Sequence, residues 1–216
     1  MKEDFGDIRC TRKWQHEITA HYSAPQTLSL KRDEEGLSVR ELNVLDEMKD
    51  WKAKPKELIV YLTENVTKDP SLFPQLIEIL KTGTDSQKGT SADVIEQLSK
   101  EKPDVVAPYI DELIGYINYK APRVKWATSE SVGNLSKNYC EEIEKAIPNL
   151  LANTADKGTV VRWATAFALG EIAKNCPATR SSLLPKINEI LKTEENNGVK
   201  NIYVKALKTI SKENRK

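Results

Sequence analysis

Apolar residues recur at helical spacing from residue 38 to residue 212, and one apolar helical stretch is repeated along the chain. The clearest copy spans 159–174 and reads TVVRWATAFALGEIAK. A close copy, RVKWATSESVGNLSK, begins at Arg123, and a fainter one, GVKNIYVKALKTIS, begins at Gly198. Because a segment that recurs at a period of about 37 residues is typical of stacked helical units, the pattern predicts an all-α repeat array.

A second kind of apolar segment, which contains a proline, precedes each repeated helix. We expect the two segments to form a pair of helices. These segments are FPQLIEIL, APYIDELI, IPNLLANT and LPKINEIL, with prolines at 74, 108, 148 and 185. We expect Pro148, which lies well inside its predicted helix, to bend it. A basic residue opens each following helix, namely Lys88, Lys125, Arg162 and Lys200. The predicted pairs occupy 38–67, 71–100, 104–138, 141–174 and 180–212.

The helix expected at 159–174 is apolar nearly all round, which predicts burial on several sides. Its small alanine and glycine residues would let neighbouring backbones approach closely. Its upstream copy is more polar, since it contains Ser129, Glu130 and Ser131, and we expect it to be more exposed to water.

The two ends of the chain depart from this pattern. Ser38 and Glu41 have the spacing of a capping box, which predicts a helix from Ser38 to about Trp51. Residues 1–37 do not fit the repeat, and we expect an atypical cap or a partly disordered segment there. Residues 213–216 are expected to form a basic tail.

One predicted unit, 141–174, carries a specific residue pattern: Pro148, Asp156, Val161, Arg162, Ala164, Ala168, Leu169 and Gly170. A looser version follows in the last unit, with Glu194, Val199, Lys200, Ala206 and Leu207. This pattern resembles that of HEAT-repeat proteins, which belong to the armadillo-like class. The resemblance implies a right-handed α-solenoid, an α-α superhelix of about five helix pairs.

The resemblance also implies a ladder of charged residues that links adjacent repeats. Asp156 and Arg162 are its candidates, with Glu194 and Lys200 in the last unit. Thr82 and Tyr119 stand at the places closest to that aspartate in two earlier units. We therefore expect the ladder to be incomplete on the N-terminal side.

The composition indicates a mixed, polar surface, with 30% charged residues, 6% aromatic residues and a formal net charge of +1. It shows no global bias toward nucleic acid or membranes, and no apolar run approaches the length of a membrane span. The first ten residues lack the apolar core of a secretion signal. Because Cys10, Cys140 and Cys176 are far apart and odd in number, we expect reduced thiols in a cytoplasmic protein.

Chemistry-bearing patterns are sparse. Cys10, His16 and His21 lie near one another in the sequence, but their spacing matches no zinc pattern, so we expect no metal and no cofactor. No Gly-rich phosphate loop, HExxH or GxSxG motif occurs, and no catalytic residue is predicted.

The second helices of an α-solenoid usually line its concave face, and we place the candidate binding residues there. They are Lys88, Lys125, Trp126, Lys137, Trp163, Lys174 and Lys205. Trp126 and Trp163 share one position in successive repeats, which suits stacking on a ligand or, alternatively, packing between repeats. A basic stripe of Lys205, Lys208 and Lys212 suits phosphates or an acidic partner or, alternatively, is the solvated face of the last helix.

These features favour a non-catalytic scaffold or adaptor that binds a protein or peptide on the concave face. The alternative is a protein that binds nucleic acid through the basic C-terminal helix. A relative of the HEAT-like DNA-alkylation-repair glycosylases is included in this alternative. The deoxyhypusine hydroxylases resemble this architecture but hold iron with His-Glu pairs, and no histidine follows His21 here. The oligomeric state is left open.

Overall fold

The computed structural model describes residues 32–33, 36–37 and 42–213, which belong to two units, Met1–Glu41 and Leu42–Lys216. In the first unit, β1 (Arg32–Asp33) pairs antiparallel with β2 (Gly36–Leu37). This strand pair was not predicted. The rest of the expected cap or disordered segment lies outside the described residues, as do Cys10, His16 and His21.

The second unit is built of helices joined by short turns. In chain order they are α2 (Val44–Asp50), α3 (Pro55–Lys68), α4 (Phe73–Thr82), α5 (Asp85–Glu101), α6 (Pro103–Val106), α7 (Ile110–Tyr116), α8 (Pro122–Leu135), α9 (Cys140–Glu144), α10 (Ile147–Ala152), α11 (Thr159–Asn175), α12 (Arg180–Thr193) and α13 (Asn197–Glu213). Short 3-10 helices lie between some of them: η1 (Pro70–Leu72), η2 (Ala107–Tyr109), η3 (Asn153–Ala155) and η4 (Pro177–Thr179).

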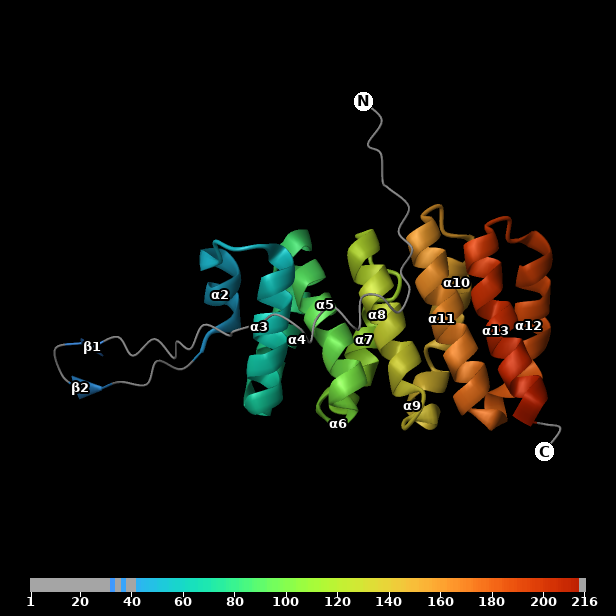
Figure 1. Cartoon of the computed structure of the whole chain (residues 1–216), viewed down its shortest axis with the longest axis horizontal. Coiled ribbons are helices and arrows are strands. Elements are labelled where there is room, and N and C mark those ends of the chain that lie inside the picture. Colours follow the sequence, from blue (N-terminus) through green and yellow to red (C-terminus); the bar gives the residue numbers. More distant parts are fainter. Residues whose placement is uncertain (1–31, 34–35, 38–41, 214–216) are drawn as a thin grey trace, which may run out of the picture. The chain divides into compact units, whose positions relative to one another are not determined.

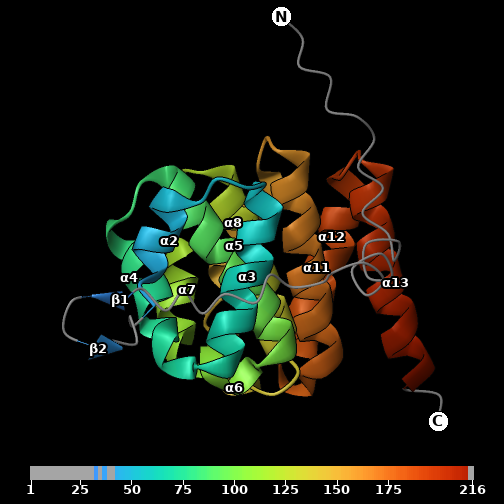
Figure 2. The ribbon, with the colours of Figure 1, turned by 60° about the vertical axis from the view of Figure 1, so that its left-hand side comes forward.

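The helices of this unit form two layers (Figures 1 and 2). The second helix of each pair packs against the second helix of the next, so that α3, α5, α8, α11 and α13 follow one another side by side. The first helices α4, α7, α10 and α12 lie against this row. The apolar core fills the space between the layers and between neighbouring pairs, and its largest fully buried side chains include Phe73, Leu135 and Tyr203.

Two predicted details of the helices are wrong. The first helix of this unit, α2, begins at Val44 rather than Ser38, because Asn43 is its N-cap and accepts a hydrogen bond from the Asp46 amide (3.0 Å). The capping box at Ser38 lies outside the described residues. Pro148 does not bend a continuous helix, because the helix is interrupted between α9 and α10. Pro148 lies in the first turn of α10, where its missing amide costs little.

The polar copy of the repeated helix is buried, contrary to the prediction. In α8, Ser129 and Ser131 are fully buried, and Glu130 is 7% exposed. The Ser131 hydroxyl donates to the Ala127 carbonyl within the same helix (2.8 Å), which satisfies this group without water. Position in the row, with a second helix on each side, decides the burial of α8 more strongly than its composition does.

Glycine allows the second helices to approach closely at two points. A Cβ atom on Gly133 of α8 would lie 2.9 Å from the Cα of Ala168 in α11. One on Gly170 of α11 would lie 3.0 Å from the Cβ of Ala206 in α13. The backbones of α8, α11 and α13 are therefore in close contact. In the part of the chain that the structure describes, each helix is too short or too polar to traverse a bilayer.

Candidate functional site

The solvent-facing side of α5, α8, α11 and α13, which we call the second-helix surface, brings equivalent positions of successive repeats together. On α8 and α11 these positions are Trp126 and Trp163, Glu130 and Phe167, Asn134 and Glu171, and Lys137 and Lys174. On α8 and α11 the surface thus changes from aromatic near the N-terminal end to polar and basic near the C-terminal end. Three parts lie on this surface or directly beneath it.

The first part is aromatic. The rings of Trp163 and Phe167 are stacked in parallel, with centroids 6.2 Å apart and an interplanar angle of 6°. Phe167 also lies against Gly133 of α8, so this stack contributes to packing between repeats. Trp126 and Trp163 are nevertheless only partly buried, and nearby Val160 is 54% exposed, the one large apolar side chain so exposed among residues 42–213. The aromatic residues therefore pack the repeats and also present apolar surface to solvent.

The second part is a pair of buried carboxyl groups on facing helices, Glu96 of α5 and Glu130 of α8. Lys100 forms an ion pair with Glu96, and the Gln97 amide donates to the same carboxylate (2.7 Å). Burial, followed by the charge of Glu96, raises the pKa of Glu130 to about 8, while Lys100 and the Trp126 side chain oppose this shift. Glu130 therefore keeps its proton at neutral pH.

A third acidic group lies one turn away on α5. Arg123 of α8 donates two hydrogen bonds to Asp93, from Nε (2.9 Å) and from its terminal nitrogen (2.6 Å). Burial nevertheless raises the pKa of Asp93 to about 6, because desolvation outweighs the guanidinium charge. The Arg123 side chain passes over Gly89, where a Cβ atom would lie 2.8 Å from its Cδ.

Glu130 makes stability depend on pH. The folded state holds this proton up to about pH 8, whereas the unfolded state releases it near 4.5, so unfolding releases a proton between these values. We expect the free energy of unfolding to fall as the pH rises from 6 to 8, by up to about 1.4 kcal/mol per pH unit. Asp93 adds to this slope only below about pH 6. Urea unfolding at several pH values measures the slope.

The variant Glu130→Gln isolates this effect, because the amide keeps a hydrogen-bond donor and carries no titratable proton. Its stability should be less dependent on pH than that of the parent between pH 6 and 8. Equal slopes for the two proteins would show that Glu130 titrates normally.

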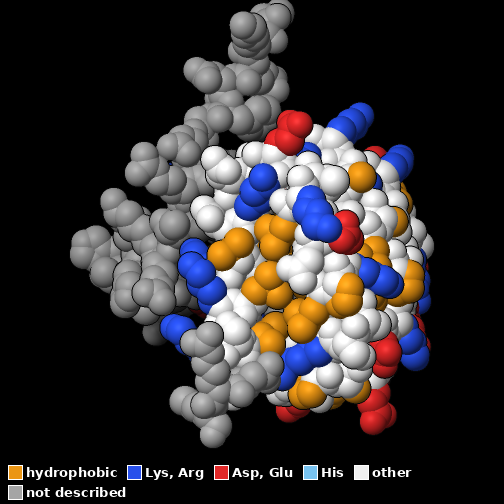
Figure 3. Space-filling view, turned by 90° about the vertical axis from the view of Figure 1, so that its right-hand side faces the viewer, with side chains coloured by type: hydrophobic (Ala, Val, Ile, Leu, Met, Phe, Trp, Pro, Cys, Tyr) orange, Lys and Arg blue, Asp and Glu red, His pale blue; other side chains and the backbone are white. Residues whose placement is uncertain are grey.

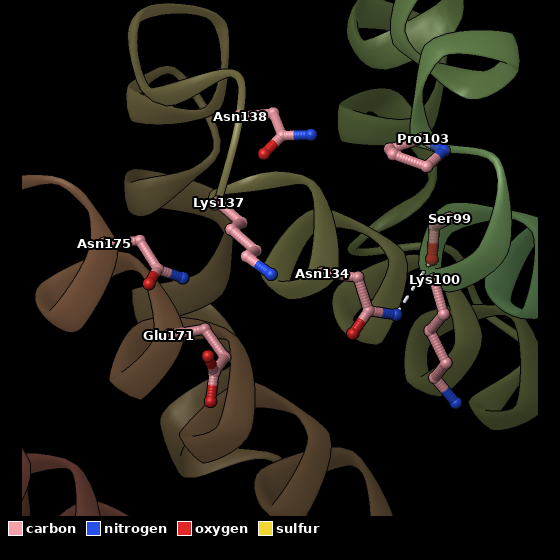
Figure 4. A pocket seen from close by; sticks show the side chains of 8 residues that line it. All are labelled: Ser99, Lys100, Pro103, Asn134, Lys137, Asn138, Glu171 and Asn175. Atoms are coloured by element: carbon pink, nitrogen blue, oxygen red, sulfur yellow. Dashed lines mark hydrogen bonds between the residues drawn. The ribbon is translucent and has the colours of Figure 1, made fainter.

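The third part is an open polar pocket of about 450 Å³ at the C-terminal ends of α5, α8 and α11 (Figure 4). Its lining residues are Ser99, Lys100, Pro103, Asn134, Lys137, Asn138, Glu171 and Asn175. Asn134 donates to the Ser99 hydroxyl (2.8 Å) and thereby bridges α8 to α5. Asn175 donates to the Ser136 hydroxyl (3.0 Å). Lys137 is exposed and makes no ion pair with any described residue.

The predicted ladder forms in part, and in it Lys125 and Arg162 each pair with the acid of the following unit. Lys125 binds Asp156 (2.7 Å), and Arg162 binds Glu194 (2.8 and 3.2 Å) while also donating to the Asp156 carbonyl (2.8 Å). Burial raises the pKa of both acids, but their hydrogen bonds outweigh it, so each pKa lies below its usual value. Lys200 makes no ion pair within residues 42–213.

At the N-terminal end of the ladder the contact between repeats is of another kind, because Tyr119 stands where the later unit has an aspartate. The buried ammonium of Lys88 binds the carbonyls of Leu80 and Lys81 (the latter at 2.7 Å) and lies 5.6 Å from the centre of the Tyr119 ring. A cation–π contact therefore replaces the ion pair. Lys88 is only 7% exposed, and Lys125 is held in the ladder, so neither is an exposed binding residue, contrary to the prediction.

The cysteines also depart from the prediction. Cys140, which begins α9, and Cys176, which follows α11, form a disulfide with a Cα–Cα distance of 5.4 Å. The expectation of reduced thiols is therefore wrong for these two residues. Their sequence separation of 36 is close to one repeat, so the solenoid brings two distant cysteines to equivalent, adjacent places.

The remaining predicted residues lie at the C-terminal end of the row. Lys174 pairs with Glu171, whereas Lys205, Lys208 and Lys212 are exposed on α13 and make no ion pair with a described residue. Viewed from this end, basic side chains surround a strip of apolar ones (Figure 3). α12 and α13 contribute the partly buried residues Leu184, Leu191, Ile202 and Leu207.

Comparisons with known proteins agree with this architecture. No family model and no curated protein matches the chain. Among solved structures, a designed armadillo repeat protein in complex with the peptide (KR)4 is similar, with a TM-score of 0.62 and 15% identity over 77% of this chain and 80% of that chain. Computationally designed armadillo repeat proteins for modular peptide recognition give a TM-score of 0.57 at 15% identity, over 77% and 80% of the two chains.

A third similar structure, of an engineered protein, has a TM-score of 0.59 and 16% identity, over 73% of this chain and 68% of that chain. These likenesses and the paired helices define the class: the chain is an armadillo- and HEAT-like α-solenoid, as its sequence predicts.

Proposed function

We propose that this protein is a non-catalytic scaffold that binds a peptide segment of a partner protein on its second-helix surface. The observation that carries the proposal is the pairing of partly exposed Trp126 and Trp163 with a polar pocket on the same helices. Apolar surface beside convergent polar groups is typical of recognition sites. The fold supports it, because the similar designed armadillo proteins are described as recognising peptides.

Nucleic acid is the less favoured ligand. Lys205, Lys208 and Lys212 suit phosphates, but stacking on bases needs exposed ring faces. The face of Trp163 that meets Phe167 is already occupied by a parallel ring. A peptide with an apolar side chain needs only the exposed edge of this stack and Val160 beside it.

Selection of peptides from a random display library on the immobilised full chain tests the proposal. Selected peptides should bind the parent and lose at least about tenfold in affinity to the double variant Trp126→Ala/Trp163→Ala, since aromatic anchors dominate such interfaces. Trp51→Ala is the matched control, because Trp51 packs on Tyr61 near the start of the row (5.2 Å between centroids) and lies off the second-helix surface. Far-UV circular dichroism verifies that each variant is folded.

Two outcomes would overturn the proposal. One is a selection that yields no binding peptide. The other is a set of peptides whose affinity is the same for the parent and for the double tryptophan variant.

A further inference from the structure

One lysine occupies the same register near the C-terminal end of four consecutive second helices. These residues, which we call the lysine row, are Lys100 on α5, Lys137 just after α8, Lys174 on α11 and Lys212 on α13. The first three recur at the repeat period seen in the sequence, and the fourth is displaced by one more residue, as is the whole of α13. The row therefore crosses the second-helix surface at right angles to the helices.

The electrostatic environment of the row is unequal. Lys100 pairs with Glu96, and Lys174 pairs with Glu171, each within its own helix. Lys137 and Lys212 are exposed and make no ion pair with a described residue. Of the acids near the row, Glu96 and Glu171 are thus already engaged. Lys137 and Lys212 therefore offer ammonium groups that no described acid pairs with.

A lysine in the last turn of a helix also complements the helix dipole, and that alone accounts for single residues. It does not account for the pocket, which opens between the first two members of the row. Lys100 and Lys137 both line it, together with Asn134 and Glu171 (Figure 4). The row thus borders a concave, polar space rather than a smooth exposed edge.

The spacing of the row matches an extended chain. Packed helices lie about 8–10 Å apart. A peptide in the extended polyproline II conformation advances about 3.1 Å per residue with three residues per turn, so every third side chain points to the same side, about 9 Å further along, which matches the distance between neighbouring lysines. We propose that the partner segment is an extended acidic peptide whose carboxylates recur at every third residue and bind the lysine row. This inference rests on the proposed function and specifies its ligand.

Fluorescence anisotropy with labelled synthetic peptides tests this inference. The first probe is a twelve-residue peptide of repeated Glu-Gly-Ser, and the second has the same composition with its four glutamates adjacent. We expect the spaced peptide to bind at least about fivefold more tightly than the clustered one. Its affinity should fall as salt is added, because exposed charges are screened. The basic peptide (KR)4 should bind more weakly than either.

Charge reversal then locates the site. The double variant Lys137→Glu/Lys212→Glu should weaken binding of the spaced peptide at least about tenfold. Lys186→Glu is the matched control, because Lys186 is exposed on α12 in the other layer, and it should leave the affinity unchanged. Far-UV circular dichroism confirms that both variants are folded.

Three results would overturn the inference: equal affinity for the spaced and clustered peptides, equal binding to the parent and the double lysine variant, or tighter binding of a single-stranded oligonucleotide of matched charge. Its failure is distinguishable from that of the proposed function. Library peptides that lack acidic residues but still need Trp126 and Trp163 would preserve the scaffold and refute the lysine row.

Discussion

Reduction of the Cys140–Cys176 disulfide should lower the free energy of unfolding by about 3–4 kcal/mol. The bond joins residues separated by 36 positions, and closing a loop of that length restricts the unfolded chain by about this amount. It ties the start of α9 to the end of α11, which are the two ends of the fourth helix pair. Urea unfolding with and without a dithiol reductant measures the difference.

The variant Cys140→Ser provides the control for this prediction. Cys140 is the better residue to replace, because Cys176 is only 2% exposed and its loss would also disturb the core. The variant should match the reduced parent in stability, and reductant should change it no further. If the oxidised and reduced parent unfold at the same urea concentration, the disulfide contributes nothing to stability.

The repeat itself explains how much of the fold could be predicted. A helix expected at 159–174 is observed as Thr159–Asn175, because three copies of one pattern reinforce each other. Helix α2 has no such copy. Its predicted start at Ser38 relied on a local capping signal, whereas the structure uses Asn43, whose side chain caps Val44–Asp50. Several residues near a helix start can serve as its N-cap, and a single sequence does not show which of them the structure uses.

The candidate site was predicted less completely, because its properties arise between repeats. Trp126, Trp163, Lys137 and Lys174 were found from their periodicity, which shows that they share a face. Glu96 and Glu130 were not found, since their burial depends on the packing of α5 against α8. The disulfide had a usable signal, a cysteine separation close to the repeat, which becomes informative only once the solenoid is accepted.

The ladder illustrates the same limit. The sequence identified Asp156, Arg162 and Glu194 as its members, and all three form ion pairs. It did not show that each base reaches the acid of the following unit, which depends on the stagger between repeats. Nor did it show that the Tyr119 ring would receive the Lys88 cation. The sequence pattern predicted which residues belong to the ladder, whereas their ion-pair partners became known only from the three-dimensional structure.

Gly133→Leu should destabilise the protein by about 3 kcal/mol or more, the largest effect we expect from a single substitution on the second helices. At this point a Cβ atom would lie 2.9 Å from the Ala168 Cα and 3.0 Å from the Phe167 ring. The nearest atom belongs to the backbone of α11, so a side-chain rotation does not relieve the contact. The helices must separate, and the Trp163–Phe167 stack beside them would shift as well.

Two other glycines calibrate this prediction. Gly170→Leu should cost less, about 1–3 kcal/mol, because a Cβ atom there meets a single atom within 4 Å, the Ala206 Cβ at 3.0 Å. Gly115 on α7 is exposed, and a Cβ atom there meets nothing within 4 Å, so Gly115→Leu should be neutral or slightly stabilising. Thermal unfolding should therefore rank the variants as Gly115→Leu most stable, then Gly170→Leu, then Gly133→Leu. If Gly133→Leu instead unfolds at the same temperature as Gly115→Leu, α8 and α11 do not touch at Gly133, and the close packing of the second helices is wrong.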